Sequence, residues 1–308
     1  MTTRPPSVLV AVLTYRRPAD LAAALPALVD QVRPLGSRGR VLVVDNDPDG
    51  GAAGAVAAAG DPVRYVHEPT PGIAAARNRA LDEADGADVL VFIDDDERPS
   101  ENWLADLLET YERVRPAAVV GPVVSEFEVY PEPWVDAGRF FDRRRLATGT
   151  AVTVAATNNL LLDMAWLRST GLRFDGRFGL SGGSDTLFTR SVVRAGGAMV
   201  WCDEAVVVDV VPADRVTRRW VLQRAYRSGN SWSRTSTELA ATAVERATSR
   251  AVCTARGTVR LGAGAGRWLV GIATRTPAHQ AKGARTVMRG LGLVSGAWGS
   301  VYSEYRRT

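Results

Sequence analysis

The feature that most constrains the fold is the alternation of short apolar runs with helix-like segments in the first half of the chain. Short strand-like runs, most of them apolar, cover residues 7–13, 40–44, 63–67, 89–93 and 117–123. Segments with helical character lie between them, at 18–32, 52–59, 72–84 and 103–114. Runs that are apolar on both faces and are separated by helices are typical of a parallel sheet covered on both sides. We therefore expect an α/β fold with a mostly parallel sheet.

Polar residues follow three of these expected strands. Thr14, Tyr15 and Arg16 follow the first, residues 45–47 (DND) the second, and residues 94–97 (DDDE) the fourth. Ligands of open α/β sheets bind beyond the carboxyl ends of the strands. The pattern therefore predicts a ligand site at that edge of the sheet.

The second half of the chain is less regular. Residues 125–150 lose periodicity and are rich in aromatic residues, Pro and Arg, which indicates a functional loop or a lid. Strand-like runs follow at 151–157, 198–202 and 205–211, and Asp163 is a candidate N-cap. Beyond residue 217 the pattern is helical to the end of the chain, with a break expected at the glycines of 262–266.

Cysteine content and apolar segments bear on the compartment. Cys202 and Cys253 are the only cysteines, which favours a reducing compartment over a disulfide framework. No long apolar region precedes Val8, so we expect no signal peptide. Uncharged stretches such as 290–303 fall short of the ~18–20 apolar residues of a membrane span. We expect a cytoplasmic protein, soluble or peripheral on the inner face of the membrane.

Charge is unevenly distributed along the chain. Residues 215–308 hold 17 basic and three acidic residues, a net of +14, which leaves −10 for residues 1–214 of the total +4. A basic tail on an acidic body favours an anionic partner, for which we expect a membrane surface and not nucleic acid. Trp268 and Leu269, edged by Arg267 and Arg275, fit helices at a membrane interface. The alternatives are a solvated arginine-rich face and helices packed back on the body.

The sharpest local signal is DDDE at 94–97. Adjacent carboxylates repel one another unless a cation compensates their charge. Because His67 and His279 are the only histidines and no cysteine cluster exists, the ligands would be oxygens, which suit Mg²⁺ or Mn²⁺. The alternative is an acidic surface turn before the helix that begins near Ser100, where negative charge suits the helix dipole.

Five motifs in order resemble the family 2 glycosyltransferases of the GT-A fold. They are TYRRP (14–18), VVDND (43–47), PGIAAARNRAL (71–81), VFIDDDE (91–97) and GGSDTLFTR (182–190). The resemblance covers about residues 7–235, and the order and spacing of the motifs make it specific. Residues 201–215 and 219–232 further resemble a subgroup that includes succinoglycan-type exopolysaccharide glucosyltransferases. The resemblance implies a glycosyltransferase domain over 1–235, with a nucleotide-binding part to about 124 and an acceptor-side part over 125–235. A basic helical extension would follow over 236–308.

The resemblance also implies site residues. A nucleotide diphosphate sugar would be bound by Thr14, Tyr15, Arg16, Asp45, Asn46, Gly72, Arg77, Asp94 and Asp95. A divalent metal, Mg²⁺ or Mn²⁺, would be held by Asp96, Asp94 and Asp209, with Asp96 on the ion that bridges the diphosphate. Three alternatives stay open: Arg77 as a solvated helix residue, Asp45 in an Asx turn, and Asp209 as a partner of Arg215.

Asp185 is the implied catalytic base. In the family an acidic residue at the start of the distal helix deprotonates the acceptor hydroxyl, and one in-line displacement inverts the anomeric carbon. Ser184 stands here where a Glu is common, which concerns the acceptor contacts more than the base. The alternative for Asp185 is helix capping or first-turn charge.

Acceptor and alternative functions complete the expectations. A glycan, a lipid-linked glycan or a small molecule would accept the sugar, and the aromatic residues of 125–150 would stack on sugars or pack the lid. Arg143, Arg144 and Arg145 would meet an acceptor phosphate. A sugar-phosphate nucleotidyltransferase is the first alternative, although LTYRRPAD lacks the glycine-rich phosphate loop of such enzymes. A non-catalytic nucleotide-sugar-binding protein is the second.

Overall fold

The first strand shows why this sequence forms a sheet with two covered faces. In the computed structural model, which describes residues 4–302, β1 (Val8–Thr14) is buried along its whole length. Leu9 and Leu13 point into one hydrophobic cluster, whereas Val10 and Val12 point into another. Because side chains alternate along a strand, a continuous apolar run supplies both faces at once.

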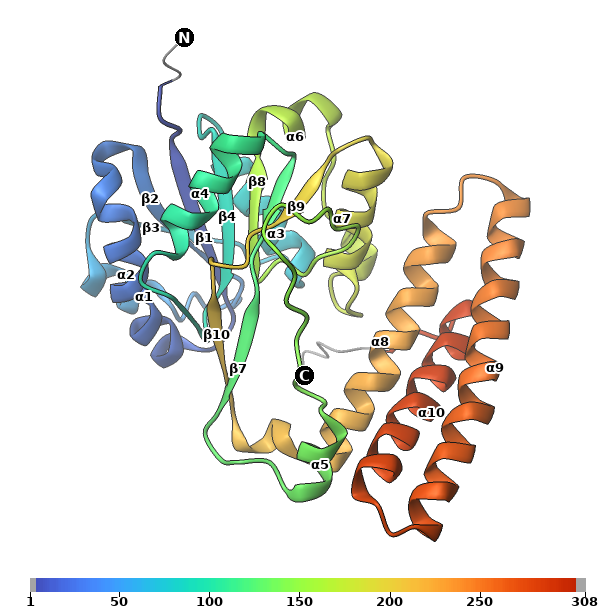
Figure 1. Ribbon diagram of the computed structural model, residues 1–308. Coiled ribbons are helices and arrows are strands. Elements are labelled where there is room, and N and C mark those ends of the chain that lie inside the picture. The colour runs from blue at the N-terminus through green and yellow to red at the C-terminus, as the bar shows by residue number, and fades with distance from the viewer. Residues whose placement is uncertain (1–3, 303–308) are drawn as a thin grey trace. The chain divides into compact units, whose positions relative to one another are not determined.

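A seven-stranded sheet forms the centre of the first compact unit (Figure 1). Its strand order is β3-β2-β1-β4-β8-β6-β9. The other six strands are β2 (Gly39–Asp45), β3 (Val63–His67), β4 (Val89–Asp94), β8 (Asn159–Asp163), β6 (Ala118–Val120) and β9 (Met199–Trp201). Every neighbouring pair is parallel except those of β8, which is antiparallel to β4 and β6. The expected mostly parallel α/β sheet is confirmed.

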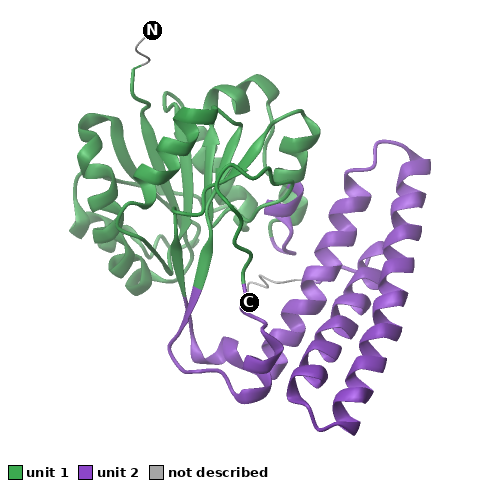
Figure 2. Ribbon diagram, in the orientation of Figure 1, with its two compact units in different colours: residues 1–124, 143–179, 188–209 green, residues 125–142, 180–187, 210–308 purple. Residues whose placement is uncertain are grey.

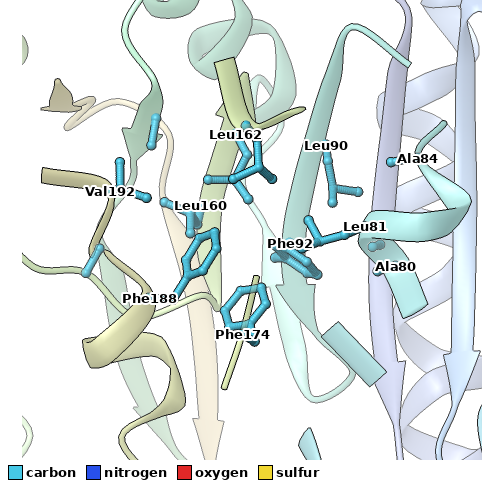
Figure 3. Packing of buried hydrophobic residues seen from close by; sticks show 14 of the residues in the cluster. Ala80, Leu81, Ala84, Leu90, Phe92, Leu160, Leu162, Phe174, Phe188 and Val192 are labelled. Atoms are coloured by element: carbon cyan, nitrogen blue, oxygen red, sulfur yellow. The ribbon is translucent and has the colours of Figure 1, made fainter. Parts of the chain in front are cut away.

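Helices cover both faces of this sheet. The helices on one face are α1 (Pro18–Val32), α2 (Ala53–Ala59) and α4 (Trp103–Val114). Those on the other face are α3 (Ile73–Glu83), α6 (Met164–Thr170) and α7 (Ser184–Arg194). On that second face Phe92, Phe174 and Phe188 pack together, and the rings of Phe174 and Phe188 stack with centroids 4.0 Å apart (Figure 3). Asp163 caps α6 as expected, because its side chain accepts from the Trp166 N–H.

The expected strand at 117–123 is divided between two sheets. Residues 118–120 form β6, and β7 (Val123–Phe127) belongs to a separate three-stranded sheet. The division falls at Gly121 and Pro122. Pro122 has no N–H for a ladder, and a Cβ on Gly121 would lie 2.4 Å from the carbonyl oxygen of Ala205. The prediction of one continuous strand over residues 117–123 is therefore wrong.

The strand expected at 151–157 is also wrong. Only Ala151 bridges Val200, and the next regular strand is β8. Ala155 instead exchanges hydrogen bonds with the hydroxyl of Thr189, at 3.2 Å in both directions. A side chain thus takes the backbone groups that a neighbouring strand would otherwise bond.

The smaller sheet has the order β5-β10-β7. Its other strands are β5 (Glu97–Pro99) and β10 (Val207–Val211), which are antiparallel. Their register places Asp209 opposite Glu97. This pairing brings a residue more than a hundred positions away next to the acidic turn after β4.

The second compact unit consists of residues 125–142, 180–187 and 210–308 (Figure 2). Its helices are α5 (Pro133–Gly138), α8 (Arg218–Glu238), α9 (Ala243–Ala273) and α10 (Pro277–Ala297). Short 3₁₀ helices cover Ala213–Val216 in this unit and Arg33–Arg38 and Gly176–Phe178 in the first unit. Among the helices of residues 4–302, none combines the length and apolarity that a membrane span needs.

The helix break expected at 262–266 is wrong, because α9 runs through these glycines without interruption. Gly264 faces α10, where a Cβ would lie 2.8 Å from the N of Val287 and 2.9 Å from the carbonyl oxygen of Gly283. Close packing between the two backbones thus outweighs the low helix propensity of glycine.

The aromatic residues of the irregular segment mainly pack against one another. Trp134 and Phe141 are buried, Phe140 stacks on Trp134, and Phe141 stacks on Trp220. Tyr130 is exposed. The packing alternative therefore holds for Trp134 and Phe141.

Candidate active site

The acidic turn after β4 is tied to the end of β1. The Thr14 hydroxyl donates to Asp95 at 2.7 Å. Arg17, which precedes α1, donates from Nη1 to Asp95 at 3.3 Å and to Asp96 at 2.7 Å. The neighbouring parallel strands β1 and β4 thus place the TYRRP and DDDE motifs together.

Several carboxyl groups crowd this position. Burial, and then the nearby Asp96, Asp95 and Asp209, raise the pKa of Asp94 to about 7, although Arg77 opposes the shift. Burial raises the pKa of Asp95 to about 6 despite the hydrogen bond from Thr14 and the charge of Arg17. The pKa of Glu97 is also raised, by burial and then by Asp94. The protein therefore disfavours the full negative charge of this cluster.

Two further side chains contact the cluster. Arg143 donates from Nη2 to Asp209 at 2.5 Å, and Asn158 donates to Glu97 at 2.6 Å. Arg143 is thus a partner of Asp209, for which a metal ion and Arg215 were the two alternatives. Sequence reasoning gave no role to Arg17 or Asn158, and it included Glu97 only as part of the DDDE cluster. Only the β5–β10 register and the side-chain contacts reveal them.

The three successive arginines after the aromatic segment all have partners within the chain. Arg144 lies over the ring of Trp201 and donates to the carbonyl oxygen of Val154. Arg145 forms a paired hydrogen bond with Asp203. Their expected contact with an acceptor phosphate stays a prediction.

Asp45 and Asn46 organise the end of β2. Asp45 is fully buried, and its carboxylate accepts from the N–H of Asp47, the N–H of Ala52 and the hydroxyl of Tyr65. The bond to the residue two positions on is the Asx turn that was the alternative for Asp45. Asn46 donates to the carbonyl oxygens of Glu68 and Thr70. These two residues therefore shape the loops beside the site, and their contact with a nucleotide stays a prediction.

Gly72 and Arg77 belong to the start of α3. Gly72 has φ 118°, and a Cβ there would lie 3.2 Å from the backbone carbon of Gly179, so glycine is favoured. The N–H of Gly72 is held by Asn46 at 3.2 Å. Arg77 lies over the ring of Phe174, and its buried Nε has no hydrogen-bond partner among the described residues. Its charge also lowers the pKa of Asp94. Arg77 is therefore a half-buried residue near the acidic cluster and not a solvated helix residue.

Tyr15 and Arg16 follow Thr14 on the same edge. Arg16 has φ 55°, which is uncommon for a residue with a side chain. Its guanidinium lies over the Tyr15 ring, and its Nε donates to Asp47 at 3.4 Å. The two residues thus connect the ends of β1 and β2, where nucleotide contacts are predicted.

The donor set at the cluster fits a hard divalent cation. Its groups are carboxylates whose pKa values are raised first by burial and then by neighbouring acids, and a bound cation would offset both effects. Among residues 4–302, no three side chains of His, Cys, Asp or Glu are arranged to hold a metal by themselves. Mg²⁺ commonly uses only one or two carboxylates together with water and substrate phosphates. The ligand set Asp96, Asp94 and Asp209 stays a prediction.

Asp185 lies in the segment Leu180–Leu187 of the second unit, on the first turn of α7. Its Oδ1 accepts from the N–H of Thr186 at 2.7 Å. Within the same unit, Arg234 of α8 donates to the Ser181 hydroxyl at 2.7 Å. The Ser184 hydroxyl is buried and has no hydrogen-bond partner among the described residues. The loop that carries Asp185 is thus held by α8.

The comparison with known families follows this geometry. The model described as "Glycosyl transferase family 2" matches residues 9–170. This range contains the edge residues of β1, β2 and β4 and more than half of the chain. The protein therefore belongs to glycosyl transferase family 2.

A curated relative and two solved structures are similar to this chain and are consistent with this family. The chain is 36% identical over 235 residues, 75% of each chain, to the succinoglycan biosynthesis protein ExoM of Rhizobium meliloti (strain 1021). Mannosyltransferase PcManGT from Pyrobaculum calidifontis, solved with GDP-Man and Mn²⁺, superposes with a TM-score of 0.63 at 18% identity, over 96% of this chain and 88% of that one. GalNAc-T7, solved with UDP, GalNAc and Mn²⁺, has a TM-score of 0.55 at 12% identity, over 75% of this chain and 51% of that one. The GT-A type of fold is confirmed.

Proposed function

We propose that this protein transfers a sugar from a nucleotide diphosphate sugar to an acceptor hydroxyl with inversion of the anomeric carbon. Family membership supports sugar transfer over nucleotidyl transfer and over simple binding. The observation that carries the proposal is the crowding of Asp94, Asp95 and Glu97 where β1 and β4 end. Buried carboxylates at a strand edge suit a site for a cation and a diphosphate.

The cation would be held by Asp96 and Asp94, with Asp209 beside them. When bound, Mg²⁺ or Mn²⁺ neutralises negative charge on the departing diphosphate. The Mn²⁺ in the PcManGT and GalNAc-T7 structures supports a divalent cation here. Arg17 bonds Asp96 and Arg143 bonds Asp209, which orients the oxygens of these two carboxylates.

The nucleotide would lie along the edge formed by the first two strands. Thr14, Tyr15 and Arg16 would line the pocket, with Asp45 and Asn46 on the side of the base or ribose. Gly72 would keep α3 close beneath the nucleotide, and Asp94 and Asp95 would lie on its ribose side. Arg77, whose Nε–H has no hydrogen-bond partner among the described residues, would reach the base or a phosphate. The GDP-Man of the PcManGT structure and the UDP of the GalNAc-T7 structure support such a donor.

Asp185 would act on the acceptor. Its carboxylate takes the proton of the acceptor hydroxyl as the acceptor oxygen bonds to the anomeric carbon. The bond between that carbon and the diphosphate oxygen breaks in the same step, and the nucleoside diphosphate leaves with the bonding electron pair. A single displacement inverts the configuration, so no covalent enzyme intermediate is required.

The acceptor is proposed to be a carbohydrate. The name of the relative ExoM, a succinoglycan biosynthesis protein, supports a glycan or a lipid-linked glycan over a small-molecule acceptor. A cytoplasmic location with peripheral membrane contact likewise stays a proposal.

The test is a panel of UDP-, GDP- and dTDP-sugars assayed for released nucleoside diphosphate, with and without short oligosaccharide acceptors. We expect one donor to be consumed with release of the diphosphate. The comparison reaction supplies a nucleoside triphosphate and a sugar 1-phosphate. If this comparison reaction releases pyrophosphate and no nucleotide sugar is consumed in the panel, the protein is a nucleotidyltransferase and the proposal is wrong.

A further inference from the structure

Helix α9 packs through its smallest residues. Gly257, Gly264 and Gly271 are buried at intervals of seven residues, which places them on one side of the helix. A Cβ on Gly271 would lie 2.5 Å from the N of Gln280 at the start of α10. In return, a Cβ on Gly283 of α10 would lie 2.6 Å from the N of Trp268. The packed side of α9 therefore has no room for large apolar side chains.

The large apolar side chains of α9 instead point away from α10. Val244 is 76% exposed, Val259 70%, Leu269 58% and Val270 51%. A helix of a soluble bundle normally does the reverse, burying its large apolar residues and exposing polar ones. No described part of the protein covers these side chains, so only another molecule or surface would bury them.

The charged residues of α9 leave its outward side free. Within Ala243–Ala273 they are Glu245, Arg246, Arg250, Arg256, Arg260 and Arg267. With about 100° of rotation per residue, all six fall in a sector of about 140° around the glycine stripe. The opposite side of this described helix, along Val244, Val252, Val259, Leu269 and Val270, contains no charged residue. We define these five residues as the α9 face.

We propose that the α9 face docks on an anionic lipid surface. The basic residues of the two helices, with Arg256 and Arg267 along one border of the face, favour a membrane over a second copy of the chain. Helix α9 has five arginines and one glutamate, and α10 adds Lys282, Arg285 and Arg289 with no acidic residue. Two copies of this basic helix pair would bring like charges together, whereas anionic headgroups complement them. Exposed apolar side chains with arginines along one border suit a helix at a membrane interface.

This docking goes beyond sugar transfer and uses none of the residues placed at the donor or base. The test variant is Val252→Asn/Val259→Asn/Val270→Asn in the full chain. Asn and Val have similar helix propensities, and all three sites are exposed, so the fold is expected to persist. The matched control is Val114→Asn/Val129→Asn, two exposed valines away from α9. Circular dichroism and the thermal midpoint verify folding of both variants.

The measurement is co-sedimentation with vesicles of phosphatidylcholine alone and of equal parts phosphatidylcholine and phosphatidylglycerol. The unmodified chain is expected to bind the anionic vesicles at least about tenfold more strongly, and the triple variant to lose about tenfold or more of that binding. The control should bind like the unmodified chain. Equal binding by the folded triple variant would overturn the proposal, as would a lack of vesicle binding by the unmodified chain. A dimer in light scattering that the triple variant abolishes, without vesicle binding, would assign the face to a second copy.

Donor cleavage without vesicles separates this inference from the proposed function. The triple variant is expected to retain it. Loss of vesicle binding with normal cleavage supports docking, whereas absent cleavage in the unmodified chain concerns only the proposed function.

Discussion

Single carboxyl groups explain most of the character of the candidate site. Asp94 and Asp95 carry pKa values raised to about 7 and about 6 because the fold buries them beside other acids. Arg17, Arg77 and Arg143 offset part of that charge. Burial of neighbouring acids lowers the stability of the fold. Such a cost is typical of functional sites, and binding of a cation and a diphosphate is the function that fits these groups.

Replacement of Asp185 tests the base. Asp185→Asn keeps the size of the side chain and removes its ability to take a proton. We expect donor binding to stay within about twofold, while kcat for transfer falls by about 10²–10⁴. Calorimetric donor binding and product formation measure the two effects. Asp214→Asn, at an exposed position, is the matched control. Near-normal turnover of Asp185→Asn would remove Asp185 from this role.

Replacement of Arg17 tests the counter-charge. Arg17→Gln removes the cation that bonds both Asp95 and Asp96, so the carboxylates repel with less compensation. We expect the thermal midpoint to fall by about 2–4 °C and Mn²⁺ to raise it more in the variant than in the unmodified protein. Differential scanning fluorimetry with and without Mn²⁺ measures both. Arg33→Gln, which breaks the exposed pair with Asp30, should change neither value. Identical responses to Mn²⁺ in Arg17→Gln and unmodified protein would contradict the account.

Sequence reasoning reached the acidic turn but not its surroundings. Residues 94–96 are adjacent in the chain and follow an apolar run, so their position at a strand end was readable. The approach of Asp209 to Glu97 depends on the β5–β10 register, and the bond from Arg143 to Asp209 spans 66 positions. Local patterns contain no information on such pairings.

At the scale of elements, periodicity predicted strands and helices well where one pattern ran unbroken. The strands β1 to β4 and the helices between them lie close to their expected ranges. The prediction was wrong where tertiary contacts decided the outcome. Gly121 and Pro122 divide one apolar run between two sheets, and Gly264 lies inside a helix because α10 packs on it.

Two glycines of α9 test the packing of the helix pair. Gly264→Ala would place a Cβ 2.8 Å from the N of Val287, so we expect a loss of about 1–3 kcal/mol in the free energy of unfolding. A Cβ on Gly262, about half a turn away, would meet no described atom within 4 Å, so Gly262→Ala should stabilise by about 0.5–1 kcal/mol. Urea unfolding measures both. Equal effects of the two substitutions would contradict the packing described for α9 and α10.

At the scale of the molecule, the residues with different proposed roles lie in different compact units. The first unit holds every residue proposed for the donor and the cation, and the second holds Asp185 and the basic helices. The order of five motifs was enough to recognise the family from the sequence. The outward position of large apolar side chains on α9 was not readable, because the same residues fit a helix packed on the body. Which side of a helix is covered depends on its partner.

The most direct test of the central claim is donor consumption as a function of bound divalent cation. The account predicts that EDTA abolishes release of nucleoside diphosphate and that Mn²⁺ or Mg²⁺ restores it in the unmodified protein. Asp96→Asn should lose most of the activity and regain little of it even in excess Mn²⁺. Full activity of the unmodified protein in EDTA would contradict the claim that the carboxylates after β4 act through a divalent cation.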